Sequence, residues 1–323
     1  MDFQFNLTTD DYKNALLDEN SVYDILIIGG GPAALTAAVY CMRKNVKTGI
    51  ITLGLGGQVA ETFSVENYMG YKYIEGVELV EKFKDQVKQF EIGLKEGVSV
   101  TEITQGEIKK VKLEDGTVYQ AKAIIICTGK SSRKLDVPGE RENVGRGVAY
   151  CSTCDAPLYG GKNVAVVGGG NSGLESVIDL AKIATHVTLL QFLDKLTGDK
   201  VLIDALNKLD NVDVLLEHEV KKIEGKDSVE SVIIKDIKNG EEKKLEVDGI
   251  FIEIGLEPNS LFVQNLLELN EFKEIIVNCD CQTNMEGIFA AGDVTTVPYK
   301  QIIIAAGEGA KAALAACDYI LKM

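Results

Sequence analysis

The most reactive pattern in this chain is a pair of cysteines, Cys151 and Cys154, separated by two residues. In a reducing compartment such a pair is catalytic or metal-binding more often than structural. The seven cysteines are odd in number and irregularly spaced, which excludes a disulfide framework. Only two histidines, His186 and His218, and no second Cys-x-x-Cys accompany the pair, so we predict no metal site. The remaining chemistry is redox, because thiolates at this spacing can form a disulfide and exchange it with another protein.

Two glycine-rich loops have the pattern that binds the pyrophosphate of a dinucleotide. Each follows a short apolar run, at 24–28 and 163–167, and precedes a helix-like stretch. In such a loop the glycines allow a tight turn, close approach of the backbone to phosphate and close helix–strand packing, and the helix N-terminus attracts the negative charge. Two such sites in one polypeptide indicate FAD together with a nicotinamide nucleotide. The loop residues are Gly29, Gly31, Pro32 and Ala34 in the first, and Gly168, Gly170, Asn171, Ser172 and Gly173 in the second.

The elements around the loops repeat in the same order. Helices are expected at 35–43 and 174–182, and further strands at 48–52 and 187–190, which gives two βαβ units. Each unit is followed by an alternating meander, with turn signals at Asp115-Gly116 and Asn239-Gly240. Each meander is followed by a buried strand that ends in glycine, at 123–129 and 249–255. The sequence therefore predicts an α/β fold with two Rossmann-like dinucleotide-binding domains.

The two copies are joined by polar crossings at 130–134 and 256–259, and the last segments, 283–293 and 302–321, return to complete the first copy. The predicted organisation is an acidic arm (1–20), an FAD domain (21–132 and 255–323) and a nicotinamide domain carrying the cysteines (133–254). A helix with one apolar face is expected at 76–90.

Composition excludes several classes of function. The 323 residues carry 34 Lys+Arg and 49 Asp+Glu, a net charge of −15, so a nucleic-acid or anionic-membrane surface is not expected. No apolar run reaches the ~18 residues of a membrane-spanning helix. The acidic N-terminus lacks the basic start and apolar stretch of a secretory signal, which favours a cytoplasmic location.

Cys151-Ser-Thr-Cys154-Asp155, placed just before the second βαβ unit, resembles the C-A-T-C-D motif of the low-molecular-weight thioredoxin reductases. The resemblance runs from Tyr23 to the C-terminus. It is strongest toward the flavoprotein subunit of alkyl hydroperoxide reductase without its N-terminal thioredoxin-like domains, as in Pro298–Ile304 and Gly307–Lys311. The segment 283–293 is similar to the second FAD fingerprint of two-dinucleotide-binding flavoproteins.

The resemblance implies roles for residues that spacing alone does not assign. Cys154 would face the flavin, Cys151 would attack the disulfide of a thioredoxin-, glutaredoxin- or peroxiredoxin-adaptor-type partner, and Asp155 would move the proton. The family also implies a homodimer. The further cofactor residues that it implies are Thr52, Gly57, Gln58, Asn67, Thr128, Gly129, Gly292, Asp293, Lys300, Gln301 and Ile302.

The electron donor is less conventional. The family usually carries H-R-R and a further arginine after the second strand of the nicotinamide domain, where guanidinium groups bind the 2′-phosphate of NADPH. This chain has Gln191-Phe-Leu-Asp-Lys195 there and no arginine between Gly168 and Asp210. We therefore expect NADH in preference to NADPH, with Gln191 hydrogen-bonding the ribose. A ferredoxin-driven thioredoxin reductase and a flavin NAD(P)H oxidase are the alternatives. A degraded second glycine loop would favour the ferredoxin-driven enzyme, and a missing Cys-x-x-Cys would favour the oxidase. In this chain both the loop and the cysteine pair are present. A redox-sensing or binding module would not need both loops and a dithiol.

Overall fold

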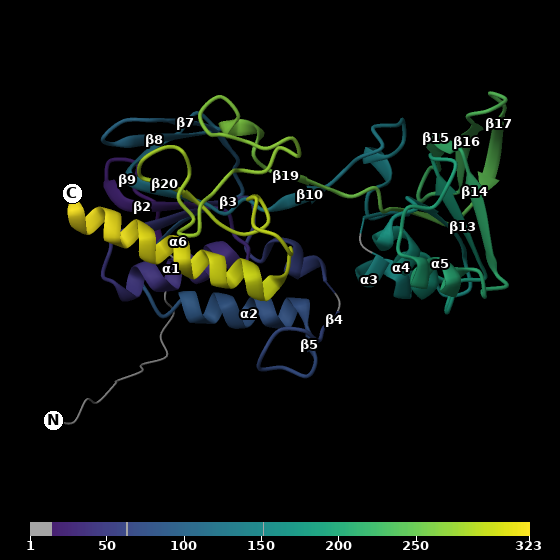
Figure 1. The fold of residues 1–323 in the computed structure, drawn as a ribbon, viewed down its shortest axis with the longest axis horizontal. Coiled ribbons are helices and arrows are strands. Elements are labelled where there is room, and N and C mark those ends of the chain that lie inside the picture. Colours follow the sequence, from purple (N-terminus) through teal and green to yellow (C-terminus); the bar gives the residue numbers. More distant parts are fainter. Residues whose placement is uncertain (1–14, 63, 151) are drawn as a thin grey trace. The chain divides into compact units, whose positions relative to one another are not determined.

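The computed structural model describes residues 15–323 except 63 and 151, with the main chain alone at 15, 61, 64, 153 and 154 (Figure 1). The chain forms two compact units. Unit 1 is built from the described residues up to Ala60, from Val65–Lys130 and from Pro258–Met323, and unit 2 is built around Ser131–Glu257. None of the helices in this described part has the length and apolarity needed to span a bilayer.

Unit 1 is organised around β2 (Val22–Ile28), the strand that leads into the first glycine loop. β2 pairs in parallel with β3 (Thr48–Thr52) on one side and β9 (Val118–Ile126) on the other. The first half of β9 pairs with antiparallel β8, and its last three residues pair with parallel β20. The strand order is β1-β6-β3-β2-β9-β8-β7. The other strands of this sheet are β1 (Ala15–Leu16), β6 (Gly93–Glu96), β7 (Val100–Thr104), β8 (Lys109–Leu113) and β20 (Ile288–Ala290). β4 (Ser64–Val65) and β5 (Ile74–Glu75) form a two-stranded sheet of their own.

Both faces of this sheet are covered. Ile25 and Ile27 belong to a core shared with α1 (Pro32–Arg43), whereas Leu26 and Ile28 belong to a second core on the opposite face. Successive side chains of a strand point to opposite faces, so a strand buried on both sides is a continuous apolar run. α2 (Gly76–Val87) contributes Val87 to the core that contains Ile25.

α1 and α6 (Ile302–Lys322) lie side by side, as Figure 1 shows. Small residues line their contact, and a Cβ on Gly309 would lie only 2.1 Å from the carbonyl oxygen of Ala33. Ala312, Ala313 and Ala316 are fully buried in the same core. The glycine and alanines therefore allow the two backbones to approach closely, which holds the last helix against the helix of the first glycine loop.

Unit 2 repeats the design. β12 (Asn163–Val167) leads into the second glycine loop and pairs in parallel with β13 (His186–Gln191) and β18 (Gly249–Ile252). The parallel order is β11-β18-β12-β13-β14, and β15-β16-β17 form a separate antiparallel sheet. The other elements are β11 (Val148–Ala149), β14 (Val212–Leu216), β15 (His218–Glu224), β16 (Ser231–Asp236), β17 (Glu242–Glu246), α3 (Ser152–Asp155), α4 (Asn171–Leu180) and α5 (Lys200–Leu206).

The two crossings between the units each contain a short strand. β10 (Lys130–Ser132) lies in the outgoing crossing and β19 (Leu256–Pro258) in the returning one, and the two strands pair with each other. The chain therefore passes between the units as a two-stranded ribbon.

The structure departs from the sequence-based expectations in two places. The acidic arm is predicted to extend to residue 20, but Ala15–Leu16 forms β1 and pairs in parallel with Gly93 and Leu94 of β6. Leu17 is buried because Gly49 and Gly93 have no side chains in its space. The rest of the arm, residues 1–14, lies outside the described residues. The segment 212–216, expected in a meander, pairs in parallel with β13 instead.

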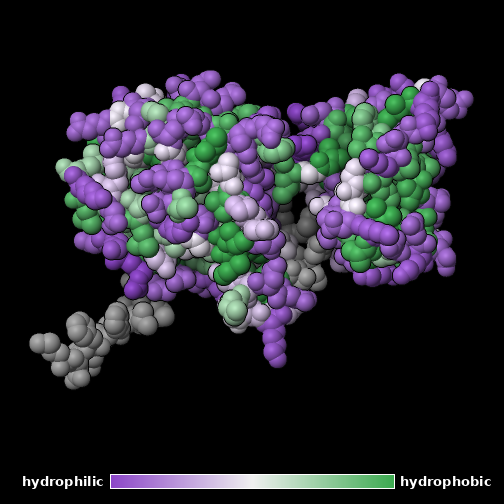
Figure 2. Space-filling model, in the orientation of Figure 1, coloured by the Kyte–Doolittle hydropathy of each residue, from purple (hydrophilic) through white to green (hydrophobic). Residues whose placement is uncertain are grey.

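The visible surface of each unit mixes hydrophilic residues with smaller hydrophobic areas (Figure 2). This is the distribution expected for a strongly acidic chain whose apolar residues are concentrated in the two-sided sheets.

Candidate functional site

The first glycine loop connects β2 to α1 and is packed tightly on one side only. Gly29 has φ +127°, and a Cβ there would lie 2.2 Å from the carbonyl oxygen of Cys127. A Cβ on Gly30 would be equally close to the carbonyl oxygen of Gly54, whereas at Gly31 no atom lies within 4 Å of that position. The backbone is therefore open at Gly31, the residue that precedes α1.

α1 begins without a side-chain cap. Pro32 occupies its first turn, no acidic residue follows there, and Gly31 offers no side-chain hydrogen bond. The first N–H groups of a helix have no carbonyl partner within it, so those of Ala33 and Ala34 are available to a ligand. Together with the helix dipole, they form a site suited to phosphate.

The C-terminal fingerprint lies beside the same helix start. Gly292, with φ +77°, has its Cβ position 3.1 Å from Cβ of Ala33. Asp293 follows it and is half-buried, and burial raises the pKa of its carboxyl group although Lys300 and Lys130 act in the opposite direction. Among the described residues none donates a hydrogen bond to this carboxyl group. An acceptor is thus left for a ligand next to the phosphate-binding helix end.

Lys130 and Lys300 are held beside Asp293 by Glu274. The Oε1 atom of Glu274 is 2.9 Å from Nζ of Lys130 and 3.1 Å from Nζ of Lys300. Burial would raise the pKa of Glu274, but hydrogen bonds from Lys130, Asn270 and Lys300 outweigh it and keep the pKa below its ordinary value. The carboxylate therefore stays charged and fixes both lysines at the site. Asp293 and Lys300 were expected from the sequence, whereas Glu274 and Lys130 were not.

The remaining predicted residues of this site connect its loops to one another. Gly57, with φ +55°, brings the loop after β3 to the first glycine loop, since its Cβ position is 3.2 Å from Cα of Gly31. Gly129, with φ +65°, ends the strand-to-crossing turn, and Ile302 begins α6. The side-chain contacts are Thr52 Oγ1 donating to Gly54 O (2.9 Å), Gln58 Nε2 to Lys130 O (2.8 Å), Asn67 Nδ2 to Gln301 Oε1 (3.0 Å) and Thr128 Oγ1 to Asn259 O (2.7 Å).

These features of unit 1 fit FAD. An open backbone at Gly31 and an uncapped helix suit its pyrophosphate, and the carboxyl group of Asp293 suits a hydroxyl or amide donor. The structure thus brings together segments that are more than 200 residues apart in the sequence.

The second glycine loop has the same one-sided packing. A Cβ on Gly168, at φ +122°, would lie 2.2 Å from the carbonyl oxygen of Glu253, and one on Gly173 would lie 1.8 Å from that of Gly168. At Gly170, the nearest atom is 3.9 Å away. Asn171 begins α4 and exchanges two hydrogen bonds with Asp199 (2.7 and 3.0 Å), while Ser172 is exposed. The loop is open where a pyrophosphate would approach.

Gln191, which is predicted to contact a ribose, has hydrogen-bond partners within the chain. It is buried, its Oε1 accepts from the amide of Gly169 at 3.2 Å, and its Nε2 donates to the carbonyl of Lys195 at 3.0 Å. A Cβ on Gly169 would lie 2.8 Å from the Gln191 amide carbon. The side chain therefore links the second glycine loop to the residues after β13, and its contact with a ribose stays a prediction. Phe192 and Leu193, which follow it, are exposed.

The segment with the predicted dithiol lies in unit 2. Cys151 is outside the described residues, and only the main chain of Cys154 is described, within α3. Asp155 ends that helix and is half-buried, and burial raises the pKa of its carboxyl group. A carboxyl group with a raised pKa can hold a proton nearer to neutral pH, as proton transfer to and from thiols requires.

Sequence reasoning missed one residue near this segment. Glu253 follows β18, and its Oε1 accepts a hydrogen bond from the amide of Ser152 at 3.3 Å. The available signal was its position as the only charged residue in the apolar stretch 249–255.

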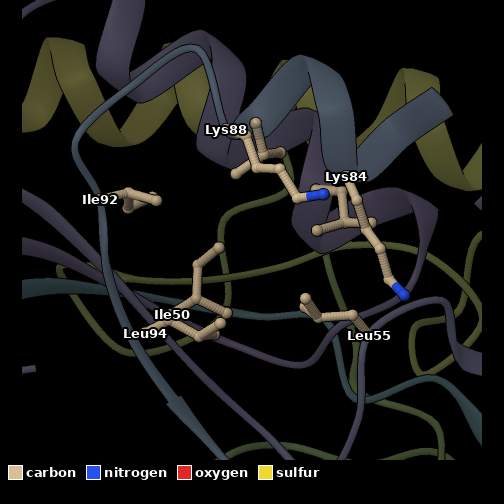
Figure 3. Close-up of a pocket in the computed structure, with 8 residues that line it drawn as sticks. Ile50, Leu55, Lys84, Lys88, Ile92 and Leu94 are labelled. Carbon is tan, nitrogen blue, oxygen red and sulfur yellow. The ribbon is translucent and has the colours of Figure 1, made fainter. Parts of the chain in front are cut away.

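A small apolar pocket lies elsewhere in unit 1, between α2 and the sheet (Figure 3). Ile50, Ile92 and Leu94 are among its lining residues, and so are Lys84 of α2 and Lys88, which directly follows this helix. These two lysines pair with acidic residues of α2, Glu81 and Asp85. The pocket contains none of the residues predicted to bind a cofactor.

Comparison with known proteins agrees with this arrangement. Residues 23–309 match the family model of the pyridine nucleotide-disulphide oxidoreductases. One of the alkyl hydroperoxide reductase subunits of Staphylococcus aureus (strain MSSA476) is 46% identical over 93% of this chain, and an NADH dehydrogenase from Ferdinandcohnia aciditolerans is 43% identical over 95%. The chain spans 59% of the length of each of these curated relatives.

Among solved structures, thioredoxin reductase from Lactococcus lactis is 36% identical with a TM-score of 0.79. The match covers 93% of this chain and 100% of that structure. The predicted α/β architecture with two Rossmann-like domains is confirmed by this likeness. From its matched residues, glycine loops and fold, the chain belongs to the pyridine nucleotide-disulphide oxidoreductase family and has a fold of the thioredoxin reductase type.

Proposed function

We propose that this chain is an FAD-dependent thioredoxin-disulfide reductase that uses NADH. In the net reaction, NADH, one proton and a protein disulfide give NAD⁺ and two protein thiols. The observation that carries the proposal is the combination, in one chain, of two glycine loops open to a pyrophosphate and a Cys-x-x-Cys-Asp sequence whose last four residues form α3. An oxidase needs no such dithiol.

The residues divide the work as follows. Gly31, the start of α1 and Asp293 hold FAD, which when bound supplies two-electron transfer between the nicotinamide and the disulfide. Cys154 is the thiol on the flavin side, and Cys151 attacks the partner's disulfide to form a mixed disulfide that Cys154 then resolves. Asp155 gives and takes the proton at the departing or attacking sulfur, a role that its raised pKa supports.

The preference for NADH rests on missing cations. The 2′-phosphate of NADPH carries nearly two negative charges, which arginine binds best. After β13 the chain offers exposed Phe192 and Leu193 and then Asp194, with Lys195 as the first basic residue. The buried amide of Gln191 is neutral and already hydrogen-bonded. A relative is named NADH dehydrogenase, which supports the same preference.

A ferredoxin-dependent reductase is the second candidate, because the basic motif is absent. The second glycine loop argues against it, because Gly168 and Gly173 are closely packed while Gly170 stays open to a ligand. A ferredoxin-driven enzyme has no need of such a dinucleotide site. The partner we propose is a small thioredoxin- or glutaredoxin-like protein. A peroxiredoxin adaptor belongs to the same class, and the likeness to an alkyl hydroperoxide reductase favours it. We further propose that the protein is a homodimer, which light scattering of the purified protein tests, and that it is located in the cytoplasm.

Anaerobic stopped-flow reduction tests the donor directly. The FAD absorbance is followed after mixing with NADH, NADPH or reduced ferredoxin at one ionic strength, and turnover is then measured with oxidised thioredoxin. Fast bleaching by NADH followed by thioredoxin reduction supports the proposal. If reduced ferredoxin bleaches the FAD absorbance and NADH and NADPH do not, ferredoxin is the donor. Reduction of oxygen without disulfide turnover would indicate an oxidase.

A further inference from the structure

Glu253 lies where the second glycine loop meets the end of β18. Its amide donates to the carbonyl of Val167 at 2.8 Å. Its own carbonyl oxygen would be 2.2 Å from a Cβ on Gly168, so that glycine is what allows its backbone to lie there. The main chain of Glu253 is therefore fixed by the loop predicted to bind the nicotinamide nucleotide.

Its side chain reaches in another direction, to the dithiol segment. Oε1 of Glu253 is 3.3 Å from the amide nitrogen of Ser152, the atom bonded to the carbonyl carbon of Cys151. Ser152 is buried, with 8% of its surface exposed, and begins α3. This contact joins residues 101 positions apart within unit 2. A carboxylate thus touches the short backbone segment between the two cysteines.

We propose that Glu253 is a positioning residue for the dithiol: its carboxylate anchors the main chain between Cys151 and Cys154 and brings a negative charge to the peptide bond that follows Cys151. The inference rests on the proposed function, in which these cysteines exchange disulfides. Glu253 touches neither a substrate nor a reacting sulfur in this role. It acts through Ser152, at the opposite end of α3 from Asp155.

The surroundings of Glu253 make its charge sensitive to pH. Burial raises the pKa of its carboxyl group to about 7, while the hydrogen bonds with Ser152 oppose this rise and Glu175 of α4 adds to it. Above that pH the carboxylate accepts strongly from Ser152 and disfavours a nearby thiolate, because like charges repel. Below it, Glu253 is neutral, and both effects weaken.

Two substitutions separate anchoring from charge. Glu253→Gln keeps an acceptor for Ser152 but removes the charge, whereas Glu253→Ala removes both. Glu175→Gln is the matched control, because it removes a charge that acts on Glu253 without touching Ser152. The measurement is the rate of iodoacetamide alkylation of Cys151 in the dithiothreitol-reduced, FAD-loaded protein between pH 5 and 10, followed by peptide mass spectrometry.

Glu253→Gln is expected to lower the pKa of the Cys151 thiol by about half to one unit, because it removes the negative charge that Glu253 carries above about pH 7. Glu175→Gln leaves that pKa within about 0.2 units of wild type. Glu253→Ala is expected to reduce thioredoxin turnover about tenfold, a typical loss for a hydrogen bond to a charged group, while Glu253→Gln retains at least about one third of it.

Equal thiol pKa values in wild type and Glu253→Gln overturn the inference, as does wild-type turnover by Glu253→Ala. If Glu253→Ala does not fold, the thiol titration of Glu253→Gln still decides. The titration uses neither NADH nor a protein disulfide. Failure of the wild-type protein to reduce thioredoxin would therefore count against the proposed function alone.

Discussion

Replacing Phe192 and Leu193 with arginine is expected to give this chain efficient use of NADPH. The two residues follow β13 directly, at the places where the family's H-R-R motif has its arginines, and they are 60% and 44% exposed. Because so much of each side chain is in solvent, the exchange removes little buried apolar surface and is expected to leave folding intact. The buried amide of Gln191 stays in place behind the loop.

The magnitude follows from the new hydrogen bonds. A charge-assisted hydrogen bond contributes about 1.5–3 kcal/mol, and at exposed positions the lower end applies because water and salt screen the charges. Two such bonds give roughly 3 kcal/mol, which is about 100-fold at 1.4 kcal/mol per factor of ten. The ratio of kcat/KM for NADPH over NADH is therefore expected to rise by about two orders of magnitude.

The assay measures kcat/KM for both coenzymes at one ionic strength, and again at higher salt, where the gain is expected to shrink. Phe192→Gln with Leu193→Gln is the matched control, since it adds polarity and length without charge. The reasoning is refuted if the arginine pair leaves the ratio unchanged, if the glutamine pair shifts it equally, or if the wild-type protein already prefers NADPH.

Three further predictions concern other parts of the molecule. Asp293→Ala is expected to lower FAD content after gel filtration, because the ligand loses an acceptor beside α1, and full occupancy would show that this fingerprint was misassigned. Cys151→Ser and Cys154→Ser are each expected to abolish disulfide reduction while FAD reduction by NADH continues; normal turnover by either variant contradicts the dithiol mechanism. Gly309→Val places carbon atoms about 2 Å from the Ala33 backbone and is expected to cost at least about 1–3 kcal/mol, seen as a lower Tm in calorimetry. Exposed Gly307→Ala, with no atom near its Cβ position, is expected to raise the Tm slightly, because alanine is about 0.8–1 kcal/mol more favourable than glycine inside a helix.

The parts of the fold that were predictable are those in which local pattern and tertiary contact agree. Gly29 and Gly168 are required by backbone geometry, because both have a positive φ and a carbonyl oxygen 2.2 Å from the Cβ position, whereas Gly31 and Gly170 leave the backbone open. This pattern identifies the loops and the strands and helices on either side. The boundaries of β3 were predicted to the residue, because its five residues are all buried between two strands.

The parts that were not predictable depend on contacts between distant residues. Leu16 is 88% exposed and belongs to a two-residue strand, so nothing local indicates that β1 pairs with β6. Apolar and polar residues alternate in 212–216, as they do in a hairpin strand. Its place in the parallel sheet depends on pairing with β13, which the local sequence does not indicate. The hydrogen bonds of the Gln191 side chain to Gly169 and Lys195 also have no signal in the local sequence. The pairing of Glu274 with Lys130 and Lys300 likewise has no signature in sequence spacing.

The return of the chain to unit 1 has a consequence for how the protein is made. When the ribosome has released the first 130 residues, β9 still lacks β20 along its last three residues, and the alanine-rich side of α1 lacks α6. Unit 2 emerges complete before these partners are synthesised, since the closing segments lie beyond residue 258. The nascent FAD-binding half therefore exposes an apolar helix face and an open strand edge during most of translation, both of which favour aggregation. In a cell, we expect chaperones or early FAD binding to affect the yield of this protein more than the stability of the finished fold does.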